Sequence, residues 1–394
     1  MKDLAIEKLV AGGEGLGHLD GKAVFVPGVL PGERVSVSIV ERRKDYDRAA
    51  LQGVIEPSRY RMAPPGCRFA GVCGGCDWLH ISYDEQLRQK VLTVQETLLR
   101  IGRIRQEAIP IEPSPAWGCR NRTQIHRDEQ GALGYMAARS NRIVAIDACP
   151  IVAGPINRVF TEKSSAPEGL DRFTVFASDE NVSIEGRDDN RDIAARVCGR
   201  DIFFSIGCFF QANLAVLERL VPWALEGLSG DAAADLYCGV GLFGSFIADR
   251  FARIICVESS AMSLSYARRN VAGFAGRDPV RGRDAQAITH EFHPLSLEQW
   301  IASGAAPRPG AGALDAVIVD PPRPGLGVEV REYLAAAAPR RLVYVSCNPV
   351  TLARDLGALI IGGYILEEMR LFDFYPQTSH VEAVAKLSHA GSPT

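Results

Sequence analysis

The 394-residue sequence lacks both a net positive charge and a long apolar run. It has 44 Lys and Arg residues against 47 Asp and Glu residues, so its formal net charge is −3. A basic surface therefore does not announce a nucleic-acid partner, and local clusters would have to bind one. No apolar stretch reaches the roughly 20 residues that a membrane-spanning helix needs, so we expect no membrane partner. The first residues, Met1-Lys2-Asp3-Leu4, show no basic-then-apolar secretion signal, so we expect a cytoplasmic protein.

The ten cysteines have no secretory context, which argues against a framework of disulfide bonds. Their remaining uses are as reduced thiols, metal ligands or a nucleophile. With 47% hydrophobic and 23% charged residues, the chain can bury a sizeable core without disulfides or metals to hold it. The length suggests two or three domains.

The first two regions of the chain, 1–58 and 59–205, differ in their patterns. In the first, glycines separate short β-forming stretches, and 35–39 alternates apolar with polar residues. This is typical of a small barrel that binds single-stranded nucleic acid, although a solvated charged hairpin at 42–48 explains it equally well. In the second, Ser82 and Glu85 predict a capping box and a helix that runs to Ile101. Strands are expected at 121–125 and 142–146.

The third region, 206–394, alternates strands with helices. Strands are expected at 234–237, 254–257, 316–319, 342–345 and 381–387, and helices at 261–272 and 330–338. This alternation predicts an α/β fold with a mostly parallel, doubly wound sheet. The stretch 303–313, rich in Gly, Ala and Pro, is expected to be a surface loop.

A glycine-rich turn follows the first strand of this region, in Asp235-Leu236-Tyr237-Cys238-Gly239-Val240-Gly241-Leu242-Phe243-Gly244. In a doubly wound sheet a ligand binds at such a turn, and glycine lets the backbone approach it. Glu258 ends the next strand, where a carboxylate can accept hydrogen bonds from both ribose hydroxyls. The spacing also fits a dinucleotide, so it does not choose the ligand. The later segment Asp320-Pro321-Pro322-Arg323 favours S-adenosylmethionine, because class I methyltransferases often hold the acceptor base there.

Cys347 directly follows another strand, in Ser346-Cys347-Asn348-Pro349. Isolated cysteines are usually inert core residues, but a thiol at a strand's carboxyl end beside a cofactor crevice is placed to act as a nucleophile. C5 of uracil is too weak a nucleophile to take a methyl group unaided. Addition of a thiolate at C6 activates C5, and a base then removes the C5 proton. Exocyclic amines need no thiol, so Cys347 argues against N-methylation.

These motifs resemble those of the RNA uracil-C5 methyltransferases, in the iron–sulfur branch that modifies 23S ribosomal RNA. The resemblance covers nearly the whole chain and rests on Ser346-Cys347-Asn348-Pro349, Asp320-Pro321-Pro322-Arg323-Pro324-Gly325, His380-Val381-Glu382 and Phe210-Gln211-Ala212-Asn213. It implies that Cys347 is the nucleophile, that Glu382 is the proton-abstracting base and that 1–58 is a TRAM domain. It also implies an S-adenosylmethionine site with Gln211, Tyr237, Glu258 and Asp320, beside Gly239 and Gly241 of the turn. Leu242 departs from the family, whose turn commonly has Asn at that position.

A cluster of cysteines opens the second region. Cys67, Cys73 and Cys76 form C-x5-C-x2-C around Gly74 and Gly75, and Cys149 is the candidate fourth ligand. Four thiolates suit zinc or an iron–sulfur cluster, and the spacing alone does not decide between them. The family resemblance implies a 4Fe–4S cluster with a structural role.

The sequence and the resemblance together predict three domains: a TRAM/OB-like β-barrel at 1–58, an α+β iron–sulfur domain at 59–205 and a Rossmann-like class I methyltransferase domain at 206–394. The expected function is S-adenosylmethionine-dependent methylation of C5 of a uridine in 23S rRNA. The target base would be flipped out or single-stranded, and Phe209 or Phe374 could stack on it unless they are core residues.

Three alternatives stay open. The first is a tRNA uracil-C5 methyltransferase. The second is an exocyclic-amine methyltransferase, although that class usually has an aromatic residue where Arg323 stands. The third is a non-catalytic RNA-binding assembly factor, which would explain the barrel but not Cys347 and Glu382. The oligomeric state is not indicated.

Overall fold

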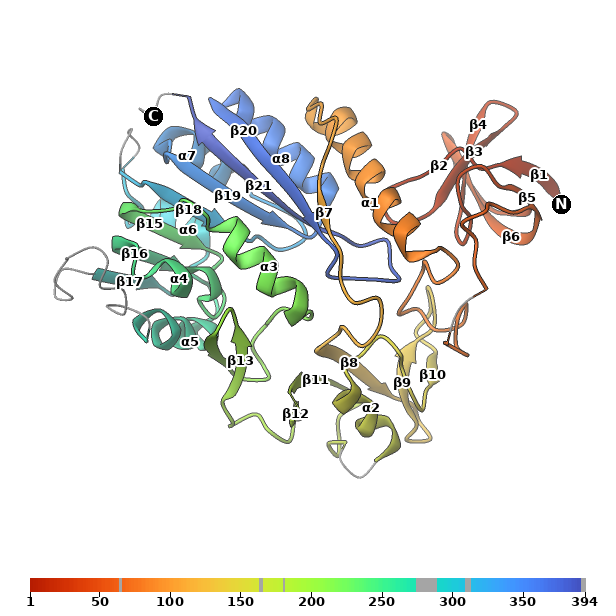
Figure 1. Ribbon diagram of the computed structural model, residues 1–394, viewed down its shortest axis with the longest axis horizontal. Coiled ribbons are helices and arrows are strands. Elements are labelled where there is room, and N and C mark those ends of the chain that lie inside the picture. Colours follow the sequence, from red (N-terminus) through yellow and green to blue (C-terminus); the bar gives the residue numbers. More distant parts are fainter. Residues whose placement is uncertain (64–65, 163–165, 180, 274–288, 309–312, 391–394) are drawn as a thin grey trace.

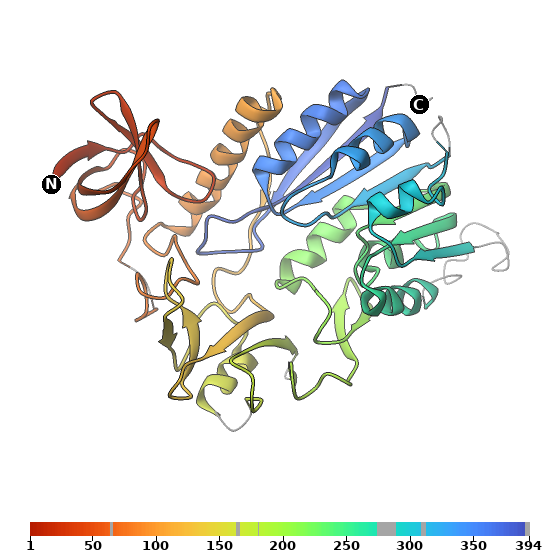
Figure 2. The ribbon, with the colours of Figure 1, turned by 180° about the vertical axis from the view of Figure 1, so that it is seen from behind.

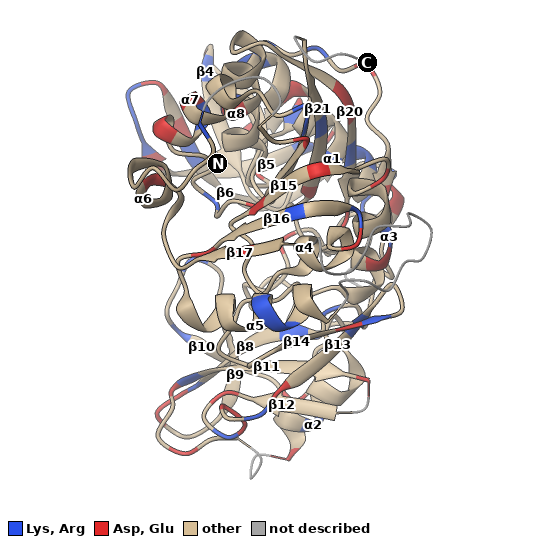
Figure 3. Cartoon of the chain, turned by 90° about the vertical axis from the view of Figure 1, so that its left-hand side faces the viewer, with Lys and Arg blue, Asp and Glu red and all other residues tan. Residues whose placement is uncertain are grey.

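Four β-sheets organise the residues that the computed structural model describes, which are 1–394 without 64–65, 163–165, 180, 274–288, 309–312 and 391–394. Figure 1 shows the largest sheet and its helices on one side of the molecule and the N-terminal sheet on the other, with a five-stranded sheet below them. Lys and Arg residues are interspersed with Asp and Glu on the face seen in Figure 3, in line with the small net charge. No helix of this described part is both long and apolar enough to cross a membrane.

The N-terminal sheet has six strands in the order β1-β5-β6-β4-β3-β2. Their bounds are β1 Lys2–Ala5, β2 Lys8–Leu9, β3 Gly15–Leu19, β4 Lys22–Val26, β5 Arg34–Arg42 and β6 Tyr46–Glu56. The predicted alternation in β5 is confirmed, since Val35 and Val37 point inward and pack with Leu4, Val24 and Val26. A sheet with one buried face follows directly from this period of two.

The second region forms a five-stranded antiparallel sheet in the order β10-β9-β8-β11-β12. Its strands are β8 Arg122–Arg127, β9 Leu133–Met136, β10 Ile143–Ala145, β11 Arg172–Ser178 and β12 Asn181–Ile184. Helix α2 (Gly154–Thr161) packs Ile156, Val159 and Phe160 against this sheet. A separate hairpin, β13 (Ile193–Val197) and β14 (Arg200–Phe204), leads into the third region.

The largest sheet has eight strands in the order β17-β16-β15-β18-β19-β21-β20-β7. They are β7 Ile111–Glu112, β15 Gly230–Leu236, β16 Phe251–Val257, β17 Thr289–His293, β18 Ala316–Val319, β19 Arg341–Ser346, β20 Tyr364–Phe372 and β21 Glu382–His389. Pairing is parallel from β17 through β19 and antiparallel on both sides of β21. The predicted α/β class and the predicted strands are confirmed.

Helices cover both faces of this sheet (Figures 1 and 2). One face packs against α3 (Leu214–Ala224), α4 (Leu242–Ile247) and α5 (Ala261–Ala272), and the other against α1 (Tyr83–Thr97), α6 (Leu297–Ala302), α7 (Val328–Ala337) and α8 (Pro349–Ile361). The predicted bounds of α5 are confirmed, whereas α7 begins two residues before the predicted start. The loop predicted at 303–313 lies partly outside the described residues.

Helix α1 and strand β7 come from the second region but pack on the largest sheet. Strand β7 pairs with β20, and α1 continues through a π-helical turn, η1 (Leu98–Gly102), that packs on α8. A Cβ on Gly102 would lie 2.6 Å from the carbonyl oxygen of Ala353, so this close approach requires glycine. The division into 1–58, 59–205 and 206–394 stays a prediction.

The predicted capping box at the start of α1 is wrong. Ser82 does occupy the N-cap position, but its side chain makes no capping hydrogen bond. The carboxylate of Glu85 instead accepts hydrogen bonds from Arg88 and Gln89 on the same helix. Local side-chain pairing one turn further along has therefore replaced the cap.

Candidate active site

The carboxyl ends of neighbouring parallel strands bring predicted site residues to one edge of the largest sheet. Leu236 pairs with Val257 on one side and with Val319 on the other. The next residue of each strand is therefore at the same level, and these residues are Tyr237, Glu258 and Asp320. Cys347 follows Ser346, the last residue of β19, at the same edge.

Glu382 reaches this edge from an antiparallel strand. Ser346 pairs with Ala383 across β19 and β21, so the register carries Cys347 opposite Glu382. Glu382 also pairs with Phe372 on β20, and it is only 3% exposed. The predicted nucleophile and the predicted base thus lie on adjacent strands.

One cavity of about 690 Å³ collects most of the predicted residues. Gln211, Tyr237, Gly239, Glu258, Asp320, Cys347 and Glu382 all line it. Its volume lies within the range of about 300–1,000 Å³ that is usual for small-molecule sites. We call it the strand-end cavity.

Gly241 is the predicted residue that does not line this cavity. Its φ of +77° is in the left-handed region, and a Cβ there would lie 2.9 Å from the Cα of Ala267 on α5. Glycine is required here because the turn packs closely on a helix. Leu242, by contrast, does line the cavity and begins α4.

The two candidate stacking aromatics differ in exposure. Phe374 is fully buried and packs in the core, so it cannot stack on a base. Phe209 is 67% exposed and lines the cavity, which is unusual for a large apolar ring. Only Phe209 of this pair is accessible.

Glu258 is held rigidly at the wall of the strand-end cavity. Its Oε1 accepts hydrogen bonds from the backbone N–H of Ser260 at 2.7 Å and from the Ser259 hydroxyl at 3.2 Å. Its Oε2 accepts from the backbone N–H of Gly239 at 3.1 Å, which ties this carboxylate to the glycine turn. A carboxylate has about four acceptor positions, so capacity remains for a ligand's hydroxyls.

Asp235 is a residue of this site whose role the sequence did not indicate. It is fully buried in β15, and its Oδ2 accepts from the backbone N–H of Gly244 at 2.7 Å. Burial raises the pKa of this carboxyl to about 7, while the hydrogen bond from Gly244 acts in the opposite direction. Its Oδ1 has no partner among the described residues. The only sequence signal is a charged residue inside an apolar strand, and its effect is to fix the start of α4.

Proton affinities in the cavity are raised by burial. Burial, with the nearby Glu382 and Asp320 charges, raises the pKa of the Cys347 thiol to about 11, and Arg323 opposes this. Burial also raises the pKa of Asp320 to about 7. The pKa of Glu382 is well above its ordinary value because of burial and then the Asp320 charge. Burial and the neighbouring carboxylates therefore favour the protonated form of the Cys347 thiol, and burial favours the protonated form of the Glu382 carboxyl.

Two further residues, Arg323 and Tyr375, line the cavity beside Cys347. The backbone oxygen of Arg323 accepts hydrogen bonds from Asn348 Nδ2 at 3.0 Å and from Thr351 Oγ1 at 3.1 Å, which holds its loop to α8. The sequence motif contains Arg323, but it does not predict that Arg323 lines the same cavity as Cys347. Tyr375 had no sequence signal, because it lies in an irregular segment between two strands.

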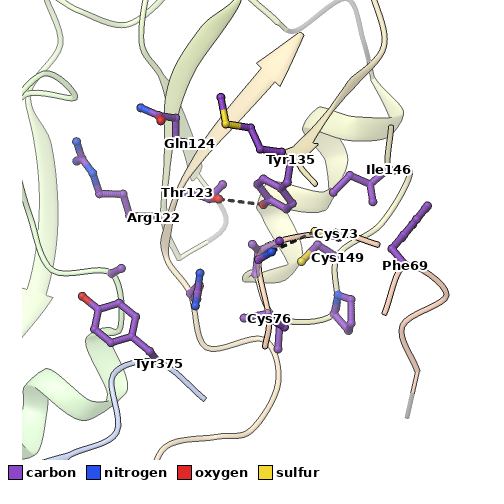
Figure 4. A pocket seen from close by; sticks show the side chains of 18 of the residues that line it. Phe69, Cys73, Cys76, Arg122, Thr123, Gln124, Tyr135, Ile146, Cys149 and Tyr375 are labelled. Atoms are coloured by element: carbon purple, nitrogen blue, oxygen red, sulfur yellow. Dashed lines mark hydrogen bonds between the residues drawn. The ribbon is translucent and has the colours of Figure 1, made fainter. Parts of the chain in front are cut away.

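A second cavity, of about 710 Å³, adjoins the first. Cys67, Cys73, Cys76 and Cys149 all line it, and we call it the cysteine cavity. The two cavities share Phe209, Phe210, Arg323 and Tyr375. Figure 4 shows Cys73, Cys76 and Cys149 gathered on one side of this cavity and Tyr375 on the other.

The backbone holds the cysteines in irregular loops. Gly74 donates its N–H to the carbonyl of Met136 at 2.9 Å, and a Cβ on Gly74 would lie 3.0 Å from that oxygen. The backbone N–H and carbonyl of Cys149 are both hydrogen-bonded to Asn157, at 2.8 and 3.1 Å. These bonds bring sequence-distant cysteines to one cavity.

Burial opposes the ionisation of three of the four thiols that line this cavity. Burial raises the pKa of Cys73 and Cys149, and it raises the pKa of Cys76 to about 12. In the part of the chain that the structure describes, no three His, Cys, Asp or Glu side chains are arranged closely enough to hold a single metal ion.

Known proteins resemble this chain over almost its full length. A 23S rRNA (uracil(1939)-C(5))-methyltransferase RlmD from Pseudomonas fluorescens is 31% identical, over 97% of this chain and 93% of that protein. An uncharacterized RNA methyltransferase from Treponema denticola is also 31% identical, over 96% of each chain. The tRNA (uracil-5-)-methyltransferase family matches residues 174–277 and 311–390. The chain belongs to the RNA uracil-C5 methyltransferase family.

The solved structure of a family member agrees with this. The tRNA (uracil-54, C5)-methyltransferase of Pyrococcus abyssi, in complex with S-adenosyl-L-homocysteine, is 27% identical and has a TM-score of 0.72. The structural match covers 98% of the present chain and 100% of the Pyrococcus abyssi chain. In the present chain, the TRAM domain family matches residues 2–51, where the N-terminal sheet lies.

Membership in the family defines the reaction class. The protein is an enzyme that methylates C5 of uridine in RNA, with S-adenosylmethionine as the methyl donor. Two of the alternatives, an exocyclic-amine methyltransferase and a non-catalytic assembly factor, are excluded by this membership.

Proposed function

We propose that Cys347 is the nucleophile of this methyl transfer and that Glu382 is the base. The observation that carries the proposal is the register of β19 and β21, which puts the two residues opposite each other. Both line the cavity that also contains the glycine turn and Glu258. A thiol and a carboxyl that lie opposite each other at neighbouring strands can reach adjacent carbons of one pyrimidine ring.

The proposed reaction proceeds through a covalent bond between Cys347 and C6 of uracil. The Cys347 thiolate adds to C6 of uracil, and the C5–C6 π electrons move onto C5 and O4 as an enolate. S-adenosylmethionine would supply an electrophilic methyl group: as C5 bonds to this methyl, the sulfonium–methyl bond would break and its electron pair would stay on sulfur, which leaves as S-adenosylhomocysteine. The Glu382 carboxylate takes the C5 proton, the C5–C6 double bond re-forms, and the sulfur of Cys347 leaves. Covalent catalysis thereby divides one difficult step into easier ones.

The charges in the cavity suggest when the thiolate forms. In the ligand-free chain, burial and the neighbouring carboxylates raise the pKa of Cys347 to about 11. A positively charged sulfonium beside Asp320 would act in the opposite direction, because an opposite charge nearby favours the ionised acid. Binding of the methyl donor would therefore favour the thiolate form of Cys347.

The residues for S-adenosylmethionine are proposed from the walls of the strand-end cavity. Glu258 would accept hydrogen bonds from the ribose hydroxyls, because its carboxylate lines the cavity and has acceptor positions left beyond its present hydrogen bonds. Gln211, Tyr237, Gly239 and Asp320 line the same cavity and would contact the rest of the molecule. Gly241 would support the turn through its packing on α5.

A covalent trap tests the catalytic proposal. RNA that carries 5-fluorouridine lacks a removable C5 proton, so the Cys347 adduct should survive denaturing electrophoresis when methyl-labelled S-adenosylmethionine is present. Cys347→Ala should form no adduct, whereas the control Cys198→Ala, at the distant β13–β14 hairpin, should form it normally. An adduct on a residue other than Cys347 would contradict the proposal.

We further propose that Cys67, Cys73, Cys76 and Cys149 hold a 4Fe–4S cluster with a structural role. All four line one cavity, and Gly74 allows the close approach of the loops that carry them. Around one zinc ion, bonds of about 2.3 Å would require sulfurs about 3.8 Å apart. A cluster holds each thiolate on a different iron, so it accepts a wider arrangement. The lining of one cavity by four thiols is the observation that supports the cluster.

Elemental analysis tests the cluster. Protein purified without oxygen should contain about four irons and four acid-labile sulfides per chain. One zinc per chain with no iron would contradict the proposal.

We propose 23S rRNA as the substrate. The RlmD relative from Pseudomonas fluorescens supports this by its coverage of both chains. The alternative, tRNA, is supported by the Pyrococcus abyssi enzyme, whose fold matches over 98% of this chain. Methylation of 23S rRNA fragments and tRNA transcripts, side by side with labelled methyl donor, separates the two. Label in tRNA alone would overturn the assignment to rRNA.

A further inference from the structure

A buried ion pair links α1 to the segment that precedes Glu382. Lys90 Nζ lies 2.5 Å from Asp373 Oδ1, and both side chains are fully buried. The same ammonium donates a hydrogen bond to the backbone oxygen of Tyr375 at 3.0 Å. These partners are 283 residues apart in sequence, so this contact joins distant parts of the chain.

The pair belongs to a larger buried network. Asp373 Oδ2 accepts from the Tyr83 hydroxyl at 2.9 Å, and that hydroxyl accepts from the backbone N–H of Ser114 at 2.8 Å. Asn213 Nδ2 donates to Ser114 Oγ at 2.8 Å and to the backbone oxygen of Phe374 at 3.3 Å. Asn213 lies two residues after Gln211, which lines the strand-end cavity. The network is therefore connected to the cavity at Gln211 as well as at Tyr375.

Helix α1 also holds the segment at a second point, one turn from Lys90. Gln86 donates to Gln377 Oε1 and accepts from the Gln377 backbone N–H, both at 2.9 Å. Gln377 has a φ of +65°, an unfavourable conformation for a residue with a Cβ. Such a conformation persists where surrounding contacts impose it.

The ion pair is connected to the proposed catalytic residues through the end of β20. Asp373 follows Phe372, which pairs with Glu382, and Glu382 lies opposite Cys347. Tyr375, whose backbone Lys90 holds, lines the strand-end cavity. A shift of the Asp373–Tyr375 segment would therefore move the cavity wall and the start of β21 together.

Stability alone does not explain a fully buried ion pair. Removing two charges from water costs free energy, and apolar side chains of similar volume often stabilise a fold equally well or better. What an ion pair adds is a fixed geometry, since its donors and acceptors match in only one arrangement. Here both carboxylate oxygens of Asp373 are used.

We propose that Lys90 is a positioning residue that acts through Asp373 to hold the Tyr375–Glu382 segment against Cys347. The proposal rests on the proposed roles of Cys347 and Glu382. It assigns to α1, a helix at the opposite end of the sequence from Glu382, a direct part in the geometry of methyl transfer.

The paired variant Lys90→Met/Asp373→Leu tests the proposal, because it removes both charges and leaves neither unpaired. The expected result is a melting temperature close to that of the wild type and unchanged S-adenosylmethionine affinity. The kcat should fall about 100-fold, the cost of a misplacement of about 1 Å, with little change in KM. A control pair on the β16–β17 edge, Arg253→Met/Glu291→Leu, should keep the wild-type kcat.

A milder variant tests the same proposal if the paired one does not fold. Tyr83→Phe keeps its ring but loses the hydrogen bonds of its hydroxyl to Asp373 and Ser114, so kcat should fall several-fold. Tyr266→Phe, whose hydroxyl bonds to the exposed Asp192, is the matched control and should have no effect. A paired variant, or Tyr83→Phe, with a wild-type kcat would overturn the proposal. If the roles of Cys347 and Glu382 are wrong, the failure appears elsewhere, as a wild-type enzyme without a Cys347 adduct on 5-fluorouridine RNA.

Discussion

The strand-end cavity and the cysteine cavity have almost equal volumes, about 690 and 710 Å³, but they are built in different ways. The first is formed where parallel strands end, so strand register decides which residues meet. The second is lined by residues of β8, β9 and β11 and by loops that carry the cysteines and are held through backbone contacts.

The two cavities should respond differently to substitutions of their lining residues. Substitutions in the strand-end cavity should alter catalysis and leave the fold intact, because the sheet does not depend on these side chains. Substitutions of the cysteines should alter the fold first, because a bound cluster would tie together loops that have little regular structure. The four residues shared by both cavities are the place where this separation should be weakest.

The largest effect is expected from Cys347→Ala. Methyl transfer should fall by at least about 10³-fold, because C5 of uracil loses its activation. The S-adenosylmethionine affinity and the melting temperature should stay near wild type. Labelled-methyl transfer and calorimetry measure these quantities, and substantial turnover would remove the covalent mechanism.

The cysteine cavity should respond in the opposite manner. Cys73→Ser or Cys76→Ser should remove the brown colour of anaerobically purified protein and lower the melting temperature by roughly 10 °C. Cys198→Ser, which does not line the cavity, is the matched control. A cysteine variant that stays colourless but keeps the wild-type melting temperature would show that this cavity needs no cluster for stability.

A moderate effect is expected in the pH dependence of the Cys347 thiol. Its pKa of about 11 in the ligand-free fold lies above the ordinary value, so alkylation should rise with pH through that midpoint. Since the fold favours the protonated thiol, its contribution to stability is present below the unfolded pKa of about 8.5 and is lost as the pH rises through the folded one. Glu382→Gln removes a nearby negative charge and should lower the midpoint. Mass spectrometry of the Cys347 peptide follows the reaction, and an unchanged midpoint would mean that the two groups do not interact.

The smallest effect is expected from Phe209, on the wall between the cavities. Stacking of a base on an aromatic ring contributes about 1–3 kcal/mol, so Phe209→Ala should raise the KM for RNA about tenfold. The kcat should be unchanged, and Phe209→Trp should retain the wild-type KM. Steady-state kinetics with an RNA fragment measures both constants. If Phe209→Ala has the same KM as the wild type, the exposed ring serves another purpose.

Much of the strand-end cavity was predictable from local sequence pattern. Parallel strands and their glycine turn specify where Tyr237, Glu258 and Asp320 must meet, because strand ends align at one edge. Cys347 and Glu382 needed the family motifs as well, since pattern alone does not pair β19 with β21. Gly241 does not line the cavity, and its packing on Ala267 leaves the same sequence signal as close approach to a ligand, so its role at the cofactor stays a prediction.

Other features were not predictable because they depend on contacts between distant residues. The ion pair of Lys90 and Asp373 has no local signal, and a helical lysine is usually solvent-exposed. The addition of β7 and α1 to the largest sheet could not be read from a two-residue strand. The capping box at Ser82 failed because several local pairings compete for Glu85.

The central claim is the division of labour between Cys347 and Glu382, and Glu382→Gln tests it most directly. Without the base, Cys347 can still add to C6 and the methyl group can still transfer, but the C5 proton remains. With ordinary uridine RNA and methyl-labelled S-adenosylmethionine, a denaturing gel should show labelled RNA joined covalently to the protein. A folded Glu382→Gln enzyme that turns over at the wild-type rate, or forms no adduct, would contradict the assignment of Glu382 as the base.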